Sequence, residues 1–444
     1  MLNQKALYKR LVFFSLFSLY LYDLTFWLLS GYSGYGTGYT NSVNAVDMGG
    51  GAASPLIGSI DNLFFLLWIS IGCCIYLLCK TKWTHNIPRR PLILYFALLS
   101  WNFFCLVRGG LNSSAYADWK GVTTSAMGGL SVCVPIILIV AMNNEYSLRI
   151  FNFFILMMKV TLVLVPLQIV KILASEESYA HIVIPALALL MLTPFLPYRK
   201  KSLIFLVIAI AFVLTIEWRT NELRIILLFA FLIAAYFRRM IPNSIFNMVN
   251  IIVFCIPIYF LISGIVTGKS VFEEQSHDSG QSTVSANGQQ VELSGDTRTL
   301  LYTEVLADLV ANNDLWLGKG VNAKYKSNIF TDDAFKFGRA NVEVGALKTL
   351  MYTGIVGLVL NALILIAAIF LGTNRSNNSL TKFFAFFLAL HWMLLFIENM
   401  ISYNIYYYIL WMIIGLCLSK KFRALSDADI RKFFSKPKLI IPRG

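Results

Sequence analysis

Long apolar runs alternate with short polar connections along the whole chain. The runs are about twenty residues long, which is the length of helix that crosses the hydrocarbon core of a bilayer. A β-barrel would instead show alternating apolar and polar positions over segments of about ten residues. The pattern therefore predicts an all-α integral membrane protein with about twelve transmembrane helices. The expected spans are 11–30, 58–79, 91–107, 125–142, 150–171, 180–197, 201–217, 223–237, 245–267, 346–371, 381–400 and 403–419.

The polar connections predict a topology, because Lys and Arg resist translocation and gather in cytoplasmic loops. With the N-terminus inside, every short inside connection carries a basic residue, whereas the outside connection 31–57 has none. An even number of spans then places both termini in the cytoplasm. The expected regions are transmembrane helices 1–9 over 1–267, a large periplasmic loop over 268–345, transmembrane helices 10–12 over 346–419, and a basic cytoplasmic tail over 420–444.

Composition agrees with a membrane protein. Hydrophobic residues make up 57% of the chain and charged residues 14%, whereas a soluble domain carries about a quarter charged residues. The net charge of +14 suits basic loops beside anionic lipid, and no nucleic-acid-binding pattern accompanies it, so no nucleic acid is expected as a partner. The seven cysteines lie in or beside apolar runs and are interpreted as small buried residues rather than disulfides.

The large loop 268–345 has two parts. Its first part, 271–296, is polar and rich in Ser, Gly, Gln and acids, which is typical of a segment without regular structure. From Asp296 to Asn312, apolar residues recur every three or four positions, which predicts an amphipathic helix. Arg298 and Tyr302 lie one turn apart on this helix, and the sequence 316–320 (WLGKG) that follows predicts a tight turn.

Arginines on the outer side are the most informative charges. Arg219 and Arg224 lie between the seventh and eighth spans, Arg108 ends the third span, and Arg298 belongs to the large loop. A guanidinium stays charged and grips phosphate with two N–H groups, so several arginines at this surface suit a lipid pyrophosphate. The alternative is that they bind lipid headgroups or local acids such as Glu222.

A few charges fall within the predicted spans themselves. Lys159 lies near the middle of the fifth span, where a lysine is costly and is usually functional or paired. Asp23, Asp61 and Glu398 lie toward outer ends; they either line an outward-facing polar cavity or form ion pairs. His391 is expected to be a packed, hydrogen-bonded residue rather than a ligand.

The motifs that are missing narrow the chemistry. The sequence has no GxxxxGK[ST] phosphate-binding loop and no large cytoplasmic loop, so a cytoplasmic nucleotide or nucleotide sugar is not expected. The four histidines are scattered, and the adjacent Asp332 and Asp333 are interpreted as solvated loop residues rather than a metal site. We therefore expect chemistry without a metal or other cofactor.

Three short pieces of sequence resemble a known family. Arg219-Thr220 precedes an apolar run; Arg298 opens a loop helix that is followed by Leu317-Gly318-Lys319-Gly320; and Glu343 leads through Thr353 to Gly354-Ile355-Val356-Gly357 in the tenth span. In this order and topology, the region from Leu214 to Leu360 resembles the bacterial O-antigen polymerase and O-antigen ligase superfamily. The resemblance implies a GT-C-like polytopic bundle in the bacterial inner membrane, active at its periplasmic face.

The resemblance also implies a reaction. A metal-independent glycosyltransferase of this family takes an undecaprenyl-diphosphate-linked oligosaccharide as its donor, and membrane lipids and a chain-length regulator protein are the further expected partners. Arg298 and Arg219 would be catalytic, because they would stabilise the diphosphate as it leaves. The residues expected to contact substrate are Arg224, Arg108, Tyr302, Lys319 and Lys159. Arg224 is also an alternative to Arg219 for the catalytic role.

One departure from the family pattern favours the polymerase branch. Ligases carry a histidine eleven residues before the first glycine of the Gly-x-x-Gly; here that position, counted back from Gly354, is Glu343. Glu343 is thus the candidate base, and the alternative is that it pairs with Arg339 or Lys348. The expected function is O-antigen polymerase. The alternatives are an O-antigen ligase acting on lipid A core, a flippase or transporter supported by Lys159, and a scaffold without activity.

Overall fold

The computed structural model describes most of the chain. The described residues are 4–30, 62–81, 83–164, 187–214, 219–236, 242–267, 282–284, 290–292, 297–326, 339, 342–399 and 401–435. Asp61 and Asp296 lie outside these described residues. Asp296 is the first residue of the predicted loop helix.

Helices make up nearly all of the described fold, as predicted. They are α1 (Gln4–Ser30), η1 (Asn62–Phe64), α4 (Phe65–Lys80), η2 (Thr84–Asn86), α5 (Arg89–Leu111), α6 (Tyr116–Thr123), η3 (Gly129–Met142), α7 (Asn144–Leu164), η5 (Thr193–Phe195), α10 (Tyr198–Leu214), α11 (Arg219–Tyr236), α12 (Asn243–Thr267), α13 (Thr297–Ala311), α14 (Gly345–Asn374), α15 (Ser379–Leu395), α16 (Ile405–Leu418), α17 (Lys420–Arg423) and α18 (Asp427–Ser435). Strands β1 (Ser282–Val284) and β2 (Gln290–Glu292) pair antiparallel, with Ser282 opposite Glu292. This hairpin falls in the part of the loop that was expected to lack regular structure.

Three helices are long and apolar enough to cross a membrane: α5, residues 146–164 of α7, and α14. Shorter apolar helices accompany them at 65–80, 129–142, 223–233, 243–259, 379–395 and 405–418. Each of these helices overlaps a span predicted from the sequence. Length and composition therefore agree with an α-helical membrane protein.

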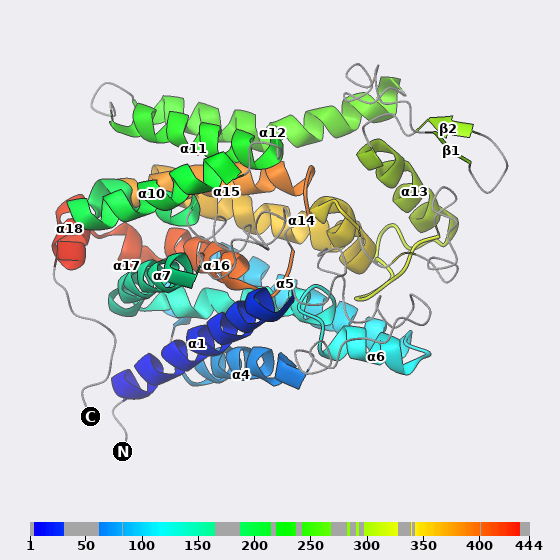
Figure 1. Ribbon diagram of the computed structural model, residues 1–444, viewed down its shortest axis with the longest axis horizontal. Helices are drawn as coiled ribbons and strands as arrows, with labels where there is room; N and C mark the ends of the chain where they lie inside the picture. Colours follow the sequence, from blue (N-terminus) through cyan, green and yellow to red (C-terminus); the bar gives the residue numbers. More distant parts are fainter. Residues whose placement is uncertain are drawn as a thin grey trace.

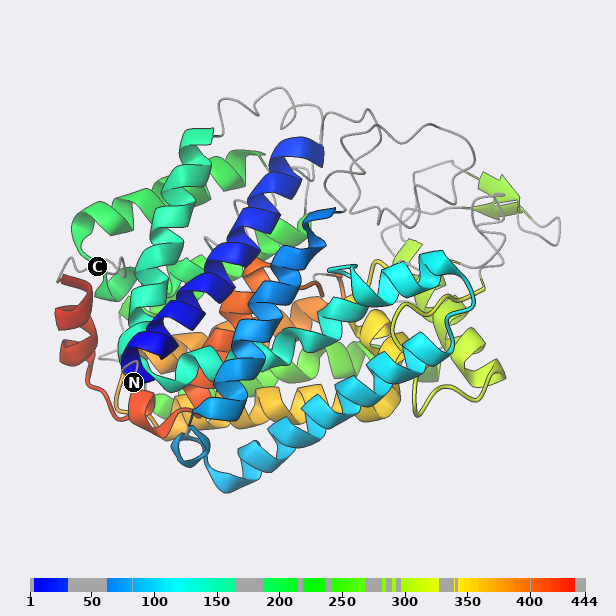
Figure 2. The same cartoon turned by 90° about the horizontal axis from the view of Figure 1, so that it is seen from below.

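The long helices run side by side, and the two ends of the bundle differ (Figures 1 and 2). Helix α1 begins and α18 ends at one end, which we call the α18 end; α6, α13 and the β-hairpin lie at the other, the α13 end. Basic side chains occupy the α18 end: Lys200 donates to the Phe434 carbonyl, and Arg423 donates to the Arg375 carbonyl.

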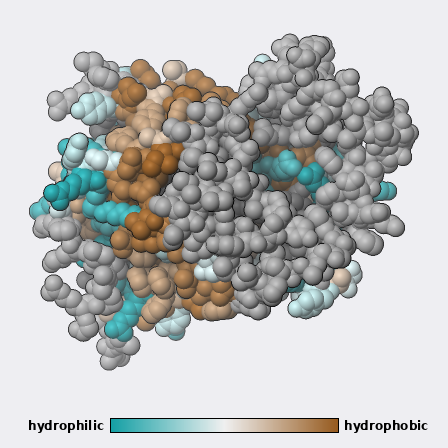
Figure 3. Space-filling view, viewed as in Figure 1, coloured by the Kyte–Doolittle hydropathy of each residue, from teal (hydrophilic) through white to brown (hydrophobic). Residues whose placement is uncertain are grey.

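Apolar residues both fill the bundle and cover its sides. Every residue of α15 and of α16 is buried, so the two helices form the centre of the bundle. On the outside, Phe103 of α5, Ile226 of α11 and Ile251 of α12 are 67%, 55% and 62% exposed. Figure 3 shows apolar residues gathered on one face beside the hydrophilic residues of the α18 end. An exposed apolar surface of this kind suits contact with lipid.

Helix α14 covers the span predicted over 346–371 and is broken at Gly354. Gly354 has φ of +66° and ψ of −174°, a conformation that is essentially restricted to glycine. The turn 315–320, whose glycines were expected to make it tight, lies against the break and replaces the lost helical hydrogen bonds. Its backbone bonds are Lys319 N–H to Met351 O, Gly320 N–H to Tyr352 O, Ile355 N–H to Leu315 O and Val356 N–H to Trp316 O.

Helix α13 packs across the α13 end of the bundle through the apolar stripe that the sequence predicted. Leu301, Val305 and Leu309 are all buried, at 1%, 0% and 0% exposure. Their spacing places them on one face, and this face meets α14. The large loop is thus anchored to the helical bundle by this helix.

Candidate functional site

Three segments that are distant in sequence meet where α15 ends. The Tyr302 hydroxyl of α13 donates to the Phe396 carbonyl at 2.8 Å. Just before α14, the Gly345 N–H donates to the Glu398 carbonyl at 3.2 Å, and the Asn399 side chain donates to the Val342 carbonyl at 2.7 Å. Residues 396–399 therefore connect the loop helix to the start of α14, and we define the candidate site around them.

Helix α11 reaches the same place through a buried ion pair. Arg224 is 1% exposed, and its Nη2 lies 2.7 Å from Oε2 of Glu398, whose side chain is 25% exposed. A buried guanidinium needs such a partner, because an unpaired charge inside the bundle is costly. Of the two alternatives for Glu398, the structure supports ion pairing. Arg224, expected to contact substrate, is engaged by this carboxylate.

The two arginines expected to be catalytic open the helices that converge here. Arg219 is the first residue of α11, rather more than one turn before Arg224, and Arg298 is the second residue of α13, about one turn before Tyr302. Their side chains fall outside the described part of the structure. The backbones show that both arginines begin helices anchored to the end of α15, at Glu398 and at Phe396.

Glu343, the candidate base, lies beside this junction and is reachable from solvent. Its side chain is 52% exposed, and Oε1 accepts a hydrogen bond from Nη2 of Arg339 at 2.8 Å. Of the two partners that the sequence suggested for Glu343, the structure shows Arg339. The other, Lys348, donates instead to the Ile401 carbonyl. Nearby, burial raises the pKa of Tyr325 to about 12, so that phenol stays protonated at neutral pH. The Glu343 carboxylate is exposed to solvent, as a base that meets substrate must be.

Arg108 and Lys319 stabilise the turn that fits against the break in α14. Arg108 Nη2 lies 2.7 Å from Oδ1 of Asp314, and the same side chain donates to the Gly318 carbonyl. Lys319 pairs with Asp308 of α13. Both were expected to contact substrate; the structure instead engages both in ion pairs within the protein.

Two other charges singled out from the sequence lie apart from the junction. Lys159 has an exposed side chain on α7, a helix that packs against α1, η3, α10 and α18. Asp23 accepts a hydrogen bond from the Ile405 N–H at 2.9 Å, at the start of α16. For Asp23 the structure therefore supports hydrogen bonding at a helix start rather than the lining of an open cavity.

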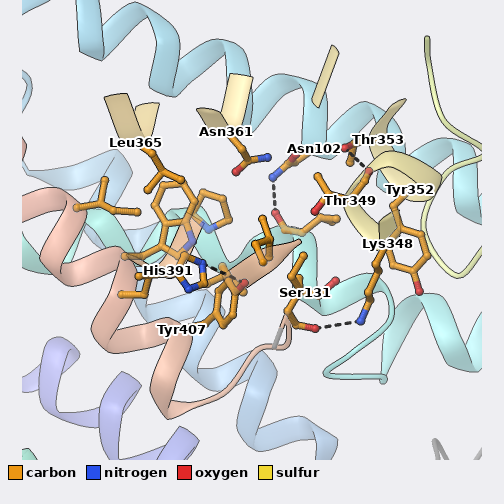
Figure 4. A pocket seen from close by; sticks show the side chains of 18 of the residues that line it. Asn102, Ser131, Lys348, Thr349, Tyr352, Thr353, Asn361, Leu365, His391 and Tyr407 are labelled. Carbon is orange, nitrogen blue, oxygen red and sulfur yellow. Dashed lines mark hydrogen bonds between the residues drawn. The ribbon is translucent and has the colours of Figure 1, made fainter. Parts of the chain in front are cut away.

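A cavity lies inside the bundle next to the junction, between α5, η3, α14, α15 and α16 (Figure 4). His391 lines it, with Nδ1 2.9 Å from the Tyr406 hydroxyl, so this histidine is hydrogen-bonded, as expected. Lys348 also lines it. Sequence reasoning missed this role of Lys348, because a lysine in the first turn of a span looks like an ordinary interfacial residue. Within the described ranges, no three His, Cys, Asp or Glu side chains are grouped as a metal site.

Fold and composition define the class of this chain: an α-helical protein with helices able to cross a membrane. Comparisons with family models, with curated proteins and with solved structures found no match for it. Its activity must therefore be argued from the site itself.

Proposed function

We propose that this chain is a bacterial surface-polysaccharide polymerase of the inner membrane. It would transfer a growing glycan from undecaprenyl diphosphate onto an incoming lipid-linked repeat unit. The observation that carries the proposal is that α11 and α13, which carry Arg219 and Arg298 in their first turns, are both anchored to the end of α15. Two arginines from segments far apart in the sequence thereby belong to one region of the protein.

The leaving group explains the need for such a pair. When the bond from the anomeric carbon to the diphosphate oxygen breaks, negative charge develops on the diphosphate. Positive groups positioned in advance stabilise that charge without reorganising. Arg219 and Arg298 would each bind phosphate oxygens with two N–H groups, and each sits in the first turn of its helix, where the backbone N–H groups also favour an anion.

Glu343 would take the proton in the same step. The hydroxyl of the acceptor sugar attacks the anomeric carbon and forms the new C–O bond, its proton passes to the Glu343 carboxylate, and undecaprenyl diphosphate leaves. The carboxylate is exposed and hydrogen-bonded to Arg339, which orients it. A glutamate in place of the histidine of ligases favours the polymerase over the ligase.

The proposed orientation follows from the charges at the two ends of the bundle. The α18 end carries Lys200, Arg375 and Arg423, as a cytoplasmic face does. The α13 end, with the candidate site, would then face the periplasm, where lipid-linked repeat units are exposed. Both termini would be cytoplasmic.

The test uses a deletion strain complemented with variants. Arg298→Ala and Arg219→Ala should each abolish long-chain glycan and leave single lipid-linked repeat units, at an unchanged level of protein in the membrane. Arg90→Ala, which removes an exposed arginine at the start of α5, is the matched control and should leave the chain-length ladder intact. Normal ladders from both site variants would refute the proposal. Long lipid-linked chains that fail to reach lipid A core in the deletion strain would show a ligase instead.

A further inference from the structure

Two helices show how far the apolar core of a bilayer would extend toward the α13 end. Helices α5 and α14 are both long and apolar enough to cross a membrane, and they run side by side (Figure 2). Arg90 is exposed at the start of α5, and Arg375 directly follows α14. A span needs about twenty residues. A core that begins at these basic residues would therefore end near Gly109 of α5 and near Ile355 of α14.

The turn 315–320 contacts both of these positions. The Ile355 N–H donates to the Leu315 carbonyl at 3.0 Å. On the other helix, a Cβ added at Gly320 would lie 2.7 Å from the Gly109 nitrogen, so the two backbones touch there. The turn therefore lies at the level where the apolar core would end.

Large aromatic side chains are exposed on this turn and on the neighbouring helix α6. Trp316 of the turn is 64% exposed, and Tyr116 and Trp119 of α6 are 85% and 49% exposed. Helix α6 is held beside the turn, because Asn322 donates to the Asp118 carbonyl at 3.3 Å. Trp and Tyr are enriched where a membrane meets water, since their rings are apolar and their N–H or O–H groups can reach a polar partner. The residue types therefore indicate the boundary of a membrane.

An exposed stripe on α5 connects these aromatic side chains to the side of the bundle. Phe103, Val107 and Leu111 are spaced four residues apart, so they share one face of the helix, and they are 67%, 44% and 80% exposed. The stripe begins inside a helix that can cross a membrane and ends where the chain turns toward α6. Leu317, next to Trp316 in the turn, is also 45% exposed. Lipid that covers the side of α5 therefore reaches the turn and α6 without a break.

We propose that the turn 315–320 and α6 form a lipid-contact surface at the α13 end, with their exposed aromatic rings among the lipid headgroups. This interaction does not depend on the reaction proposed above. It also places the candidate site relative to the membrane. Helix α14 begins at Gly345, nine positions before Gly354, which corresponds to about 14 Å of helix. The junction at the start of α14 would therefore lie beyond the apolar core, on the aqueous side of this boundary.

The test is fluorine NMR of the full-length chain labelled with fluorotryptophan, in nanodiscs of phosphatidylethanolamine and phosphatidylglycerol. The chain has nine tryptophans, and Trp316→Phe, Trp119→Phe and Trp411→Phe assign three resonances by their loss. Lipid that carries a spin label near its headgroup should broaden the Trp316 and Trp119 resonances at least about twofold more than lipid labelled near the end of its acyl chain, because such rings lie at headgroup level. Trp411 of α16, which is 5% exposed, is the buried control. The headgroup label should broaden it less than the other two.

A further variant keeps the test valid if a replacement in the turn or in α6 disturbs the fold. Tyr116→Trp adds a resonance at a position that is 85% exposed, and this resonance should show the same preference for the headgroup label. The inference is overturned if the headgroup label affects Trp316 and Trp119 no more than Trp411, since their surface would then face water or a soluble partner. It is also overturned if the chain-end label has the larger effect, since the turn would then lie inside the apolar core.

The outcome of this test is separate from that of the proposed function. The NMR measurement uses no substrate, so either contrary result would leave the polymerase proposal standing. Normal ladders from the arginine variants would refute the polymerase proposal and leave the lipid-contact surface unaffected.

Discussion

Replacing Gly354 by alanine tests the unusual backbone that connects the large loop to the bundle. Gly354 interrupts α14 at φ +66°, and a Cβ added there would lie 2.1 Å from the Trp316 carbonyl oxygen and 2.5 Å from the Gly318 nitrogen. Those atoms belong to backbone, so they can move only if the whole turn 315–320 moves. The substitution therefore acts on the turn as well as on Gly354.

The magnitude has two sources. An L-residue in this backbone region costs of order 1–3 kcal/mol. Shifting the turn also weakens four backbone hydrogen bonds across the break, each with a net contribution of about 0.5–1.5 kcal/mol. Partial loss of these bonds together with the backbone strain gives a destabilisation of about 3–6 kcal/mol, a large part of the roughly 5–15 kcal/mol that holds a typical fold together.

The assay is the free energy of unfolding of the purified protein in mixed micelles, measured by denaturant titration. Gly72→Ala is the matched control, because a Cβ at this α4 glycine would meet nothing within 4 Å; it should be neutral or slightly stabilising, as alanine favours a helix. If Gly354→Ala unfolds at the same denaturant concentration as the unaltered protein, the turn does not depend on this backbone contact and the reasoning fails.

Three smaller predictions concern single contacts, and unfolding titrations check each of them. Glu398→Gln should destabilise by about 3 kcal/mol because it leaves the buried Arg224 without its charge partner; the double variant with Arg224→Met should recover part of the loss, and strictly additive effects would contradict the pairing. Trp101→Phe should cost about 1 kcal/mol by removing the 2.8 Å hydrogen bond from the indole to the Thr353 carbonyl freed by the helix break, and an unchanged stability would contradict that role. Arg108→Ala should destabilise by about 1–2 kcal/mol, since it removes charge-assisted bonds to Asp314 and to the Gly318 carbonyl of the turn; a loss of glycan chain length at unchanged stability would show instead that this arginine acts on substrate.

Short-range patterns in the sequence predicted much of the fold. The apolar runs correspond to helices, because a chain in lipid must satisfy its backbone within each segment. The loop helix was expected over 296–312 and is found as α13 at 297–311, since its three- and four-residue spacing is a local property. The span predicted over 346–371 is found as α14, but its break at Gly354 could not be read from the span, because the break depends on a turn in another segment.

The partnerships in the site could not be predicted from the sequence. Arg224 and Glu398 are separated by 174 positions, and no local pattern indicates which acid meets which arginine. In the proposed reaction, Arg219 rather than Arg224 would bind the diphosphate, because Arg224 is already paired with Glu398. The position of Lys348 became informative only when α5, α14 and α15 enclosed a cavity that it lines.

The sequence by itself determined the class of this protein and the approximate positions of most of its described helices. Hydrophobic period and charge bias carry that information because they act within single segments. Only the tertiary structure decided that α11, α13 and the start of α14 meet at the end of α15, and that a polar cavity lies beside them. Which helix faces pack together depends on the combined shape and charge of many segments, and no single segment records it.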